Sequence, residues 1–267
     1  SRLGMDDDRV RPALAQALFL QQRHSQVTTL TLDGLGKTSA SIVLAYQARA
    51  FTDRQEFDQA EHVLRQADAI SPYAADVFYA RAALALARED WQATDQALRN
   101  VEMVDPDFIY TPAAYGELAW RQGDLVSAEL WFTKAIRRGH DYWHDRLRRG
   151  QVRLAQDNLD GALTDVRALL DAGAANPPVL LFAYRVFALR GERQDGHQFC
   201  AAEDRRGAAG VVEALVAGGR RRRIPDDERG SAALQLPGDE VEAGLFPANA
   251  DPFLLGPGRG AARPRRI

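Results

Sequence analysis

The sequence predicts an all-α protein made of stacked helix–turn–helix repeats. The first observation is a 34-residue step between small residues that each fall inside a predicted helix: Ala48, Ala82, Gly116 and Gly150. The second is that two further positions keep this step, one mostly alanine (Ala60, Thr94, Ala128, Ala162) and one bulky and apolar (Leu64, Leu98, Phe132, Val166). A single helix pair cannot bury its own apolar face, so a fixed period of this length predicts stacking of neighbouring pairs.

The clearest copy of the repeat spans residues 109–142. It reads as two short amphipathic helices joined by a turn at Gln122-Gly123-Asp124. Small side chains at Gly116 and Ala128 allow the two helix backbones to approach closely. The turn acids Glu56, Asp90 and Asp124 keep the 34-residue step, and so do the prolines that end two second helices, Pro72 and Pro106.

These positions resemble those of the tetratricopeptide repeat (TPR). That repeat has a small residue in its first helix, an alanine and a bulky apolar residue in its second, and a proline at its exit. The resemblance covers four ungapped repeats, at 41–74, 75–108, 109–142 and 143–176. Thr94 replaces the usual alanine, and His140 and Ala174 stand where proline is expected. The resemblance implies a right-handed superhelical solenoid whose first helices line a concave inner surface.

The flanking segments depart from the repeat. Residues 8–40 read as a degenerate N-terminal repeat and a linker, and 177–204 as a partial or degenerate fifth repeat. Residues 205–267 are of low complexity, with an arginine run at 220–223 and six prolines, so we expect a largely disordered C-terminal tail. Because the chain starts at Ser1 without an initiator Met and strongly prefers Arg over Lys, as a GC-rich coding sequence does, we expect a fragment of a longer protein. Its compartment, the cytoplasm or the envelope of a bacterium, stays open.

Composition narrows the function classes. The formal net charge of −3 gives no field that argues for nucleic acid or an anionic membrane as a partner. No apolar run approaches the roughly 20 residues of a membrane-spanning helix. The single cysteine, Cys200, excludes an internal disulfide.

Three motifs suggest chemistry and are better explained structurally. His140-Asp141-Tyr142-Trp143-His144 is similar to the zinc-protease pattern HExxH, but it straddles a repeat boundary and lacks a third ligand. Gly36-Lys37-Thr38 matches the end of a phosphate-binding loop without its first glycine, and reads as a linker followed by an N-capping Thr or Ser. The arginine run at 220–223 has no alternating aromatic residues, as base stacking would need. We therefore expect no catalytic residues, no metal and no cofactor.

The predicted binding surface follows from the resemblance. Partners of TPR arrays bind the concave groove, and the outward-facing positions of the first helices carry residue types that dominate binding hot spots. These candidate contact residues are Tyr46, Arg49, Tyr79, Tyr110, Glu117, Trp120, Arg121, Arg148 and Gln151. The Lys, Asn and Arg clamp with which some TPR cochaperones hold a C-terminal carboxylate is not supported, because no Lys or Asn stands at the matching positions.

The leading hypothesis is a non-catalytic scaffold that binds a peptide or protein partner. The phrases LAREDW, WRQGDL and RLAQDNL resemble the turns of bacterial TPR proteins of envelope and exopolysaccharide-export systems, including lipoproteins that accompany exosortase. Two alternatives remain open. One is the TPR arm of a larger enzyme, such as a glycosyltransferase or sulfotransferase, and the other is a self-associating array.

Overall fold

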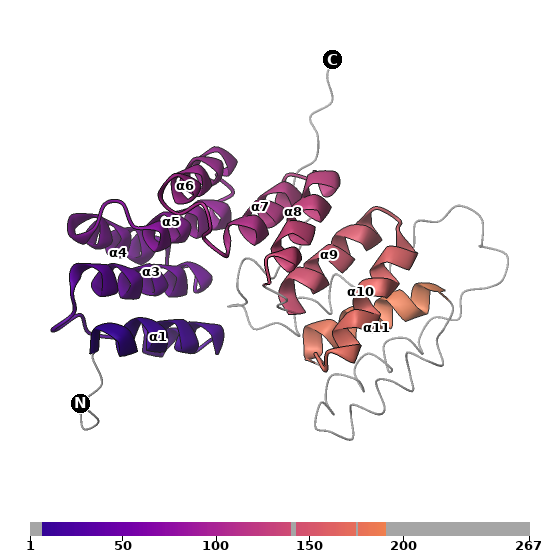
Figure 1. Ribbon diagram of the computed structural model, residues 1–267, viewed down its shortest axis with the longest axis horizontal. Coiled ribbons are helices and arrows are strands. Elements are labelled where there is room, and N and C mark those ends of the chain that lie inside the picture. Colours follow the sequence, from indigo (N-terminus) through magenta and orange to yellow (C-terminus); the bar gives the residue numbers. More distant parts are fainter. Residues whose placement is uncertain (1–6, 140–142, 175, 191–267) are drawn as a thin grey trace, which may run out of the picture. The chain divides into compact units, whose positions relative to one another are not determined.

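The computed structural model describes residues 7–139, 143–174 and 176–190. Within these ranges the chain forms eleven helices and no strands (Figure 1). The helices are α1 (Asp7–Leu20), α2 (His24–Val27), α3 (Lys37–Asp53), α4 (Phe57–Ile70), α5 (Ala75–Ala87), α6 (Trp91–Val104), α7 (Thr111–Arg121), α8 (Leu125–Arg137), α9 (Trp143–Ala155), α10 (Leu159–Asp171) and α11 (Pro177–Arg190). The chain divides into two compact units, and the boundary falls inside α8. The described part of the first unit is 7–131, and that of the second is 132–139, 143–174 and 176–190.

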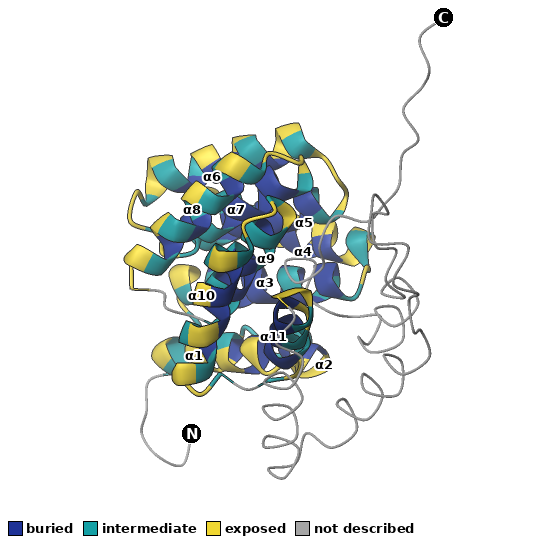
Figure 2. Cartoon of the chain, turned by 90° about the vertical axis from the view of Figure 1, so that its right-hand side faces the viewer, coloured by how far each residue is buried: buried dark blue, intermediate teal, exposed yellow. Residues whose placement is uncertain are grey.

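The helices keep the period of the sequence. The second helices of the four central pairs begin at Phe57, Trp91, Leu125 and Leu159, each 34 residues after the last. All twelve residues that define the repeat are buried, among them Ala48, Ala60 and Leu98 with no exposed surface. Figure 2 shows the consequence, since the helices are buried along one side and exposed along the other. The 34-residue step therefore marks the contact face of each helix.

The turns between paired helices share one backbone conformation. A residue with positive φ stands at Gln55 (61°), Glu89 (59°), Gly123 (80°) and Asp157 (61°). The next residue's N–H donates to the carbonyl five residues earlier, as in Asp90 N–H to Ala85 O at 2.9 Å, and the bond recurs at the same length in all four turns. This arrangement satisfies carbonyls left open at the end of a helix and reverses the chain within a few residues.

Helices α1 and α2 pack against α3 through the same kind of turn. Gln22 has a φ of 58°, and Arg23 N–H donates to Leu18 O at 2.9 Å. Ala15 and Val27, the small residues of the degenerate repeat, have no exposed surface. The N-capping prediction for the linker was wrong: α3 begins at Lys37 with Gly36 as its N-cap, and no side chain of the linker caps it. A side chain from α1 takes that place, because Asp8 Oδ1 accepts from Gly36 N–H at 2.6 Å.

The second unit packs α9, α10 and α11 around a separate core. Leu147, Val166, Val179 and Val186 are among its buried side chains. Asp165 lies inside it with no exposed surface, and its carboxylate accepts from two guanidinium groups of α9. Arg149 Nη2 lies 2.5 Å from Oδ1, and Arg153 Nη1 lies 2.9 Å from Oδ2. Two cations on one buried carboxylate join α9 to α10.

Several predictions fall outside the described residues. They are the expected turn at His140, the second helix of the fifth repeat with Cys200, and the low-complexity segment 205–267 with its arginine run.

Candidate functional site

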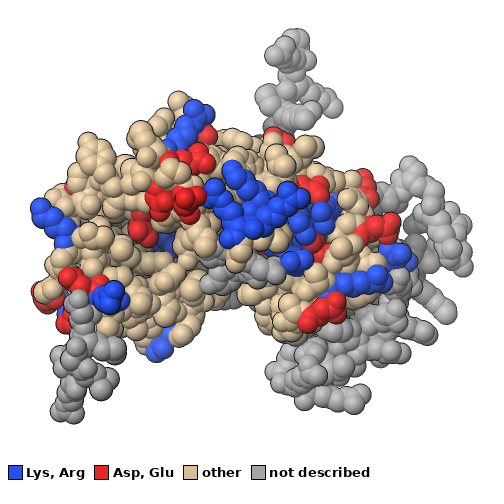
Figure 3. Space-filling model, viewed as in Figure 1, with Lys and Arg blue, Asp and Glu red and all other residues tan. Residues whose placement is uncertain are grey.

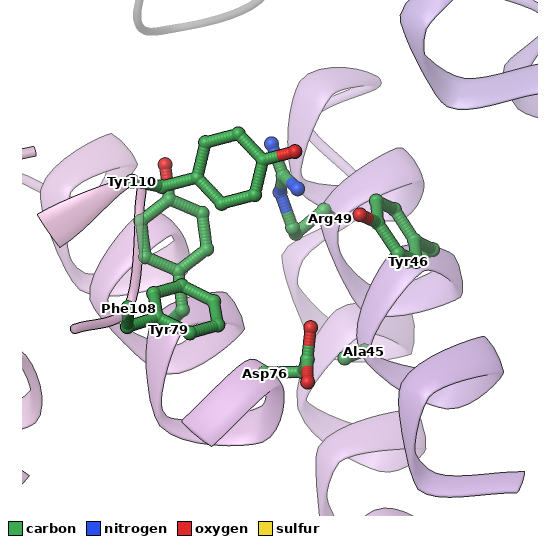
Figure 4. Close-up of a pocket in the computed structure, with 7 residues that line it drawn as sticks. All are labelled: Ala45, Tyr46, Arg49, Asp76, Tyr79, Phe108 and Tyr110. Atoms are coloured by element: carbon green, nitrogen blue, oxygen red, sulfur yellow. The ribbon is translucent and has the colours of Figure 1, made fainter. Parts of the chain in front are cut away.

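Four of the nine candidate contact residues lie together in the first unit. They line a pocket formed by α3, α5 and the segment between α6 and α7 (Figure 4). Its complete lining, here called the Arg49 pocket, is Ala45, Tyr46, Arg49, Asp76, Tyr79, Phe108 and Tyr110. Tyr46 and Arg49 lie three residues apart on α3, a spacing that puts both side chains on one face of a helix.

The centre of the pocket is the Arg49 guanidinium, which is surrounded by aromatic rings. Its Cζ atom lies 5.4 Å from the ring centre of Tyr46 and 5.0 Å from that of Tyr79. Phe19 of α1 lies closer still, at 4.1 Å. A cation within about 6 Å of a ring face is attracted by the ring's negative quadrupole, more strongly when water is partly excluded. Three helices thus hold one guanidinium in place.

The remaining rings form the second wall. The Tyr79 ring centre lies 5.4 Å from Phe108 and 5.6 Å from Tyr110, and those two rings lie 5.7 Å apart. Such distances and tilted orientations are typical of favourable aromatic pairs. Tyr110 also joins the wall to α1, because Gln16 Nε2 donates to its hydroxyl at 2.8 Å.

The electrostatics of the pocket are those of a partly desolvated site. Burial raises the pKa of Tyr46; Arg49 opposes this, while Tyr110, hydrogen-bonded to its hydroxyl, and Asp76 add to it. The phenol is therefore neutral and keeps its proton. Burial also raises the pKa of Asp76, and the positive charge of Arg49 acts in the opposite direction. Arg49 is thus the centre of the ring contacts and also the cation that acts most strongly on the half-buried Asp76 carboxyl.

The pocket is too narrow to admit a water molecule. Tyr46 and Tyr79 are each 6% exposed, whereas Arg49 and Tyr110 are half-buried and reach the rim. A small molecule would have to displace the rings to enter. The arrangement instead offers a fixed rim of a guanidinium and a phenol, which can contact a partner lying across it.

The other five candidate residues do not line the pocket. Glu117 and Trp120 of α7 are buried, and Glu117 Oε1 pairs with Arg121 Nε at 3.1 Å. In the second unit, Arg148 of α9 is 4% exposed and donates to Gln151 Oε1 at 3.2 Å. None of the nine candidates is fully exposed.

Sequence reasoning missed five residues of the site, one of which, Ala45, is a small buried residue of α3. Phe19 and Gln16 lie in the degenerate repeat, which was not assigned to the groove. Asp76 was missed because an acid in the first turn of a helix has an ordinary structural role. Phe108 lies just after Pro106 in the segment between α6 and α7, where an aromatic residue is expected to pack in the core and not to line a binding site. The available signal was the pair of small residues Ala15 and Val27, whose spacing marks 8–40 as a degenerate helix pair that precedes α3.

Two further properties bear on chemistry. Among the described residues, no group of three His, Cys, Asp or Glu side chains is placed to hold a metal ion. His144 of the HExxH-like motif lies in the first turn of α9, where burial first, and Arg148 second, lower its pKa to about 4.

In the part of the chain that is described, no helix has both the length and the apolar character needed to cross a membrane.

Solved structures with the same arrangement of helices establish the fold. The chain is similar to PilF of Pseudomonas aeruginosa (14% identity, TM-score 0.56, 78% of this chain and 96% of that one) and to PilW, a type IV pilus biogenesis factor (13%, 0.60, 79% and 100%). It is also similar to a tetratricopeptide repeat protein from Parabacteroides merdae (12%, 0.55, 81% and 86%). The fold is that of a tetratricopeptide repeat array. No family model matches the sequence, and no curated protein matches it.

Proposed function

We propose that the protein is a non-catalytic scaffold that binds a protein or peptide partner across the rim of the Arg49 pocket. The observation that carries this proposal is the convergence of Tyr46, Arg49, Tyr79 and Tyr110. They come from three successive predicted repeats and gather around one guanidinium. Tyrosine and arginine are the residue types most enriched in binding hot spots.

Preorganisation supports the same function. The Arg49 guanidinium is already in contact with three rings, and Tyr110 is already hydrogen-bonded to Gln16. Side chains that are ordered before binding lose little conformational entropy when a partner arrives. The narrowness of the pocket favours a partner that covers the rim over a ligand that fills it.

For the wider assembly, we propose a complex at the bacterial envelope, with exopolysaccharide export as the leading candidate. The turn phrases that resemble envelope TPR proteins support it. It is compatible with the similarity to PilW, whose name places that protein in type IV pilus biogenesis.

Capture of a partner tests the scaffold function. Immobilised protein recovers binding proteins from an extract of the source organism, and the recovered proteins are compared with those held by Arg49→Met. Methionine keeps an apolar side chain against the rings and removes the charge. Arg99→Met on α6 is the matched control, because Arg99 is exposed and lies outside the pocket. We expect recovery to fall at least about tenfold with Arg49→Met only. Equal recovery by all three folded proteins would contradict the proposal.

A further inference from the structure

A second surface, separate from the Arg49 pocket, lies in the second unit and is strongly basic. We call it the basic ridge, formed by Lys134, Arg137 and Arg138 at the end of α8 and Arg146, Arg149 and Arg153 along α9. Within each helix the three residues are spaced to share one side. Arg149 Nη1 donates to Thr133 Oγ1 at 3.3 Å, which ties the two helices together at the ridge. Figure 3 shows basic side chains forming a continuous area on this face.

Charge is divided unequally between the two units. Of the described residues, the second unit contains ten Lys and Arg against five Asp, whereas the first contains eleven Lys and Arg against eighteen Asp and Glu. The formal net charge of the whole chain, −3, hides this division. Each copy of the protein therefore has a first unit with excess negative charge and a second unit with excess positive charge.

The ridge cations also have local structural roles. Asp165 binds Arg149 and Arg153 from the interior, so one carboxylate faces two guanidinium groups. The positive side chains at the C-terminal end of α8 interact favourably with the negative end of its helix dipole. Lys134, Arg137 and Arg138 are also exposed, so their charges can contact a second protein at the surface.

We propose that the basic ridge is a docking surface for the acidic first unit of a second copy of this chain. Guanidinium groups recognise carboxylates through two-point contacts, as Arg149 does with Asp165 through Nε at 3.1 Å and Nη2 at 2.5 Å. Charge complementarity within one sequence supplies the partner, because every copy that brings a ridge also brings an acidic unit. This contact is independent of the function proposed for the Arg49 pocket.

The contact joins two different surfaces, so it is head-to-tail. Such contacts build rings or open chains instead of a symmetric pair. The average mass of the full chain therefore rises above 29.5 kDa with increasing concentration at about 0.05 M salt. It returns to the monomer value at about 0.5 M salt, where charges on neighbouring molecules are screened.

The first test is light scattering with size separation on the nuclease-treated full chain. The ridge variant K134E/R137E/R138E, at three exposed positions, should associate at least about tenfold more weakly than the wild type. The control variant R65E/R81E/R99E changes the net charge equally but places it on the first unit. It should associate at least as strongly as the wild type. Association that is unaffected by salt, or reduced equally in both variants, would overturn the proposal, as would a monomer at every concentration.

A mixing experiment tests whether the first unit of a second copy is what binds the basic ridge. The ridge variant cannot use its own ridge, but its first unit is intact, so the wild-type ridge should still bind it. Fluorescently labelled ridge variant should sediment as a monomer alone and faster when unlabelled wild type is added at low salt. A labelled variant that is not captured would show that the ridge does not bind the first unit. Association that disappears on nuclease treatment would assign the ridge to nucleic acid instead.

Discussion

At the scale of single residues, the close packing of the repeat is clearest at Gly150. A Cβ atom at this position would lie 2.8 Å from Phe182 Cε1 and 3.3 Å from Asp165 Cβ. Both neighbours are buried, so neither ring nor carboxylate can move away freely. The smallest residue is therefore required where α9 meets α10 and α11.

We predict that Gly150→Ala destabilises the protein by about 1–3 kcal/mol, although alanine is the better helix former. The cause is the overlap of the new methyl group with the Phe182 ring. Chemical denaturation measures the change. The double variant Gly150→Ala/Phe182→Leu removes that ring and should recover part of the loss. A single variant as stable as the wild type would show that the helices are not packed this closely.

The left-handed turn residues give a prediction of opposite sign. Glu89 adopts a φ of 59°, which costs a residue with a Cβ about 1 kcal/mol or more relative to glycine. Gly123 already occupies the equivalent turn one repeat later. Glu89→Gly should therefore stabilise the protein by about 0.5–1 kcal/mol in thermal unfolding. Gln96→Gly, at an exposed position within α6, is the control and should destabilise by about 1 kcal/mol. If both substitutions destabilise equally, the turn conformation is not as described.

At the scale of helices, the Asp165 network joins α9 to α10. Removing one partner of a buried ion pair leaves the other charges without compensation, so Asp165→Ala should cost about 3–5 kcal/mol. Replacing all three charges, as in D165L/R149M/R153M, should restore most of that stability, since apolar packing often substitutes well for a buried ion network. Urea denaturation of both variants compares them. A triple variant no better than Asp165→Ala would mean that packing, not uncompensated charge, sets the cost.

The first turn of α9 adds a dependence on pH. His144 has a pKa of about 4 in the folded protein and about 6.5 when unfolded, so the unfolded chain binds more protons between these values. Its contribution to stability is therefore complete above about pH 6.5 and is lost as the pH falls toward 4. His144→Gln, which does not titrate, should show a smaller drop in Tm between pH 7 and pH 5 than the wild type. Parallel Tm curves for the two proteins would exclude this role.

At the scale of the whole molecule, periodicity predicted the fold and contacts between distant segments completed the site. The repeat positions could be found because each helix pair uses the same contact face, so burial repeats with the sequence. The turn conformation of Glu89 and Asp157 was not predicted, because the usual signal is glycine, and among the four described turns between paired helices that signal is present only at Gly123. The contact of Phe19 with Arg49 depends on how α1 packs against α3, and its own repeat is degenerate. Asp165 would be placed on the surface by residue type, and only its two arginine partners explain its burial.

The most direct measurement of the scaffold proposal is the affinity of a captured partner for three proteins in about 0.5 M salt, where association through the basic ridge is screened. Isothermal titration calorimetry compares the wild type, Arg49→Met and the control Arg99→Met. We predict that Arg49→Met weakens binding about 10–100-fold, or about 1.4–2.7 kcal/mol, and that Arg99→Met changes it less than about twofold. Equal affinity of the wild type and a folded Arg49→Met, or an equal loss in both variants, would contradict the proposal that the Arg49 pocket is the partner-binding site.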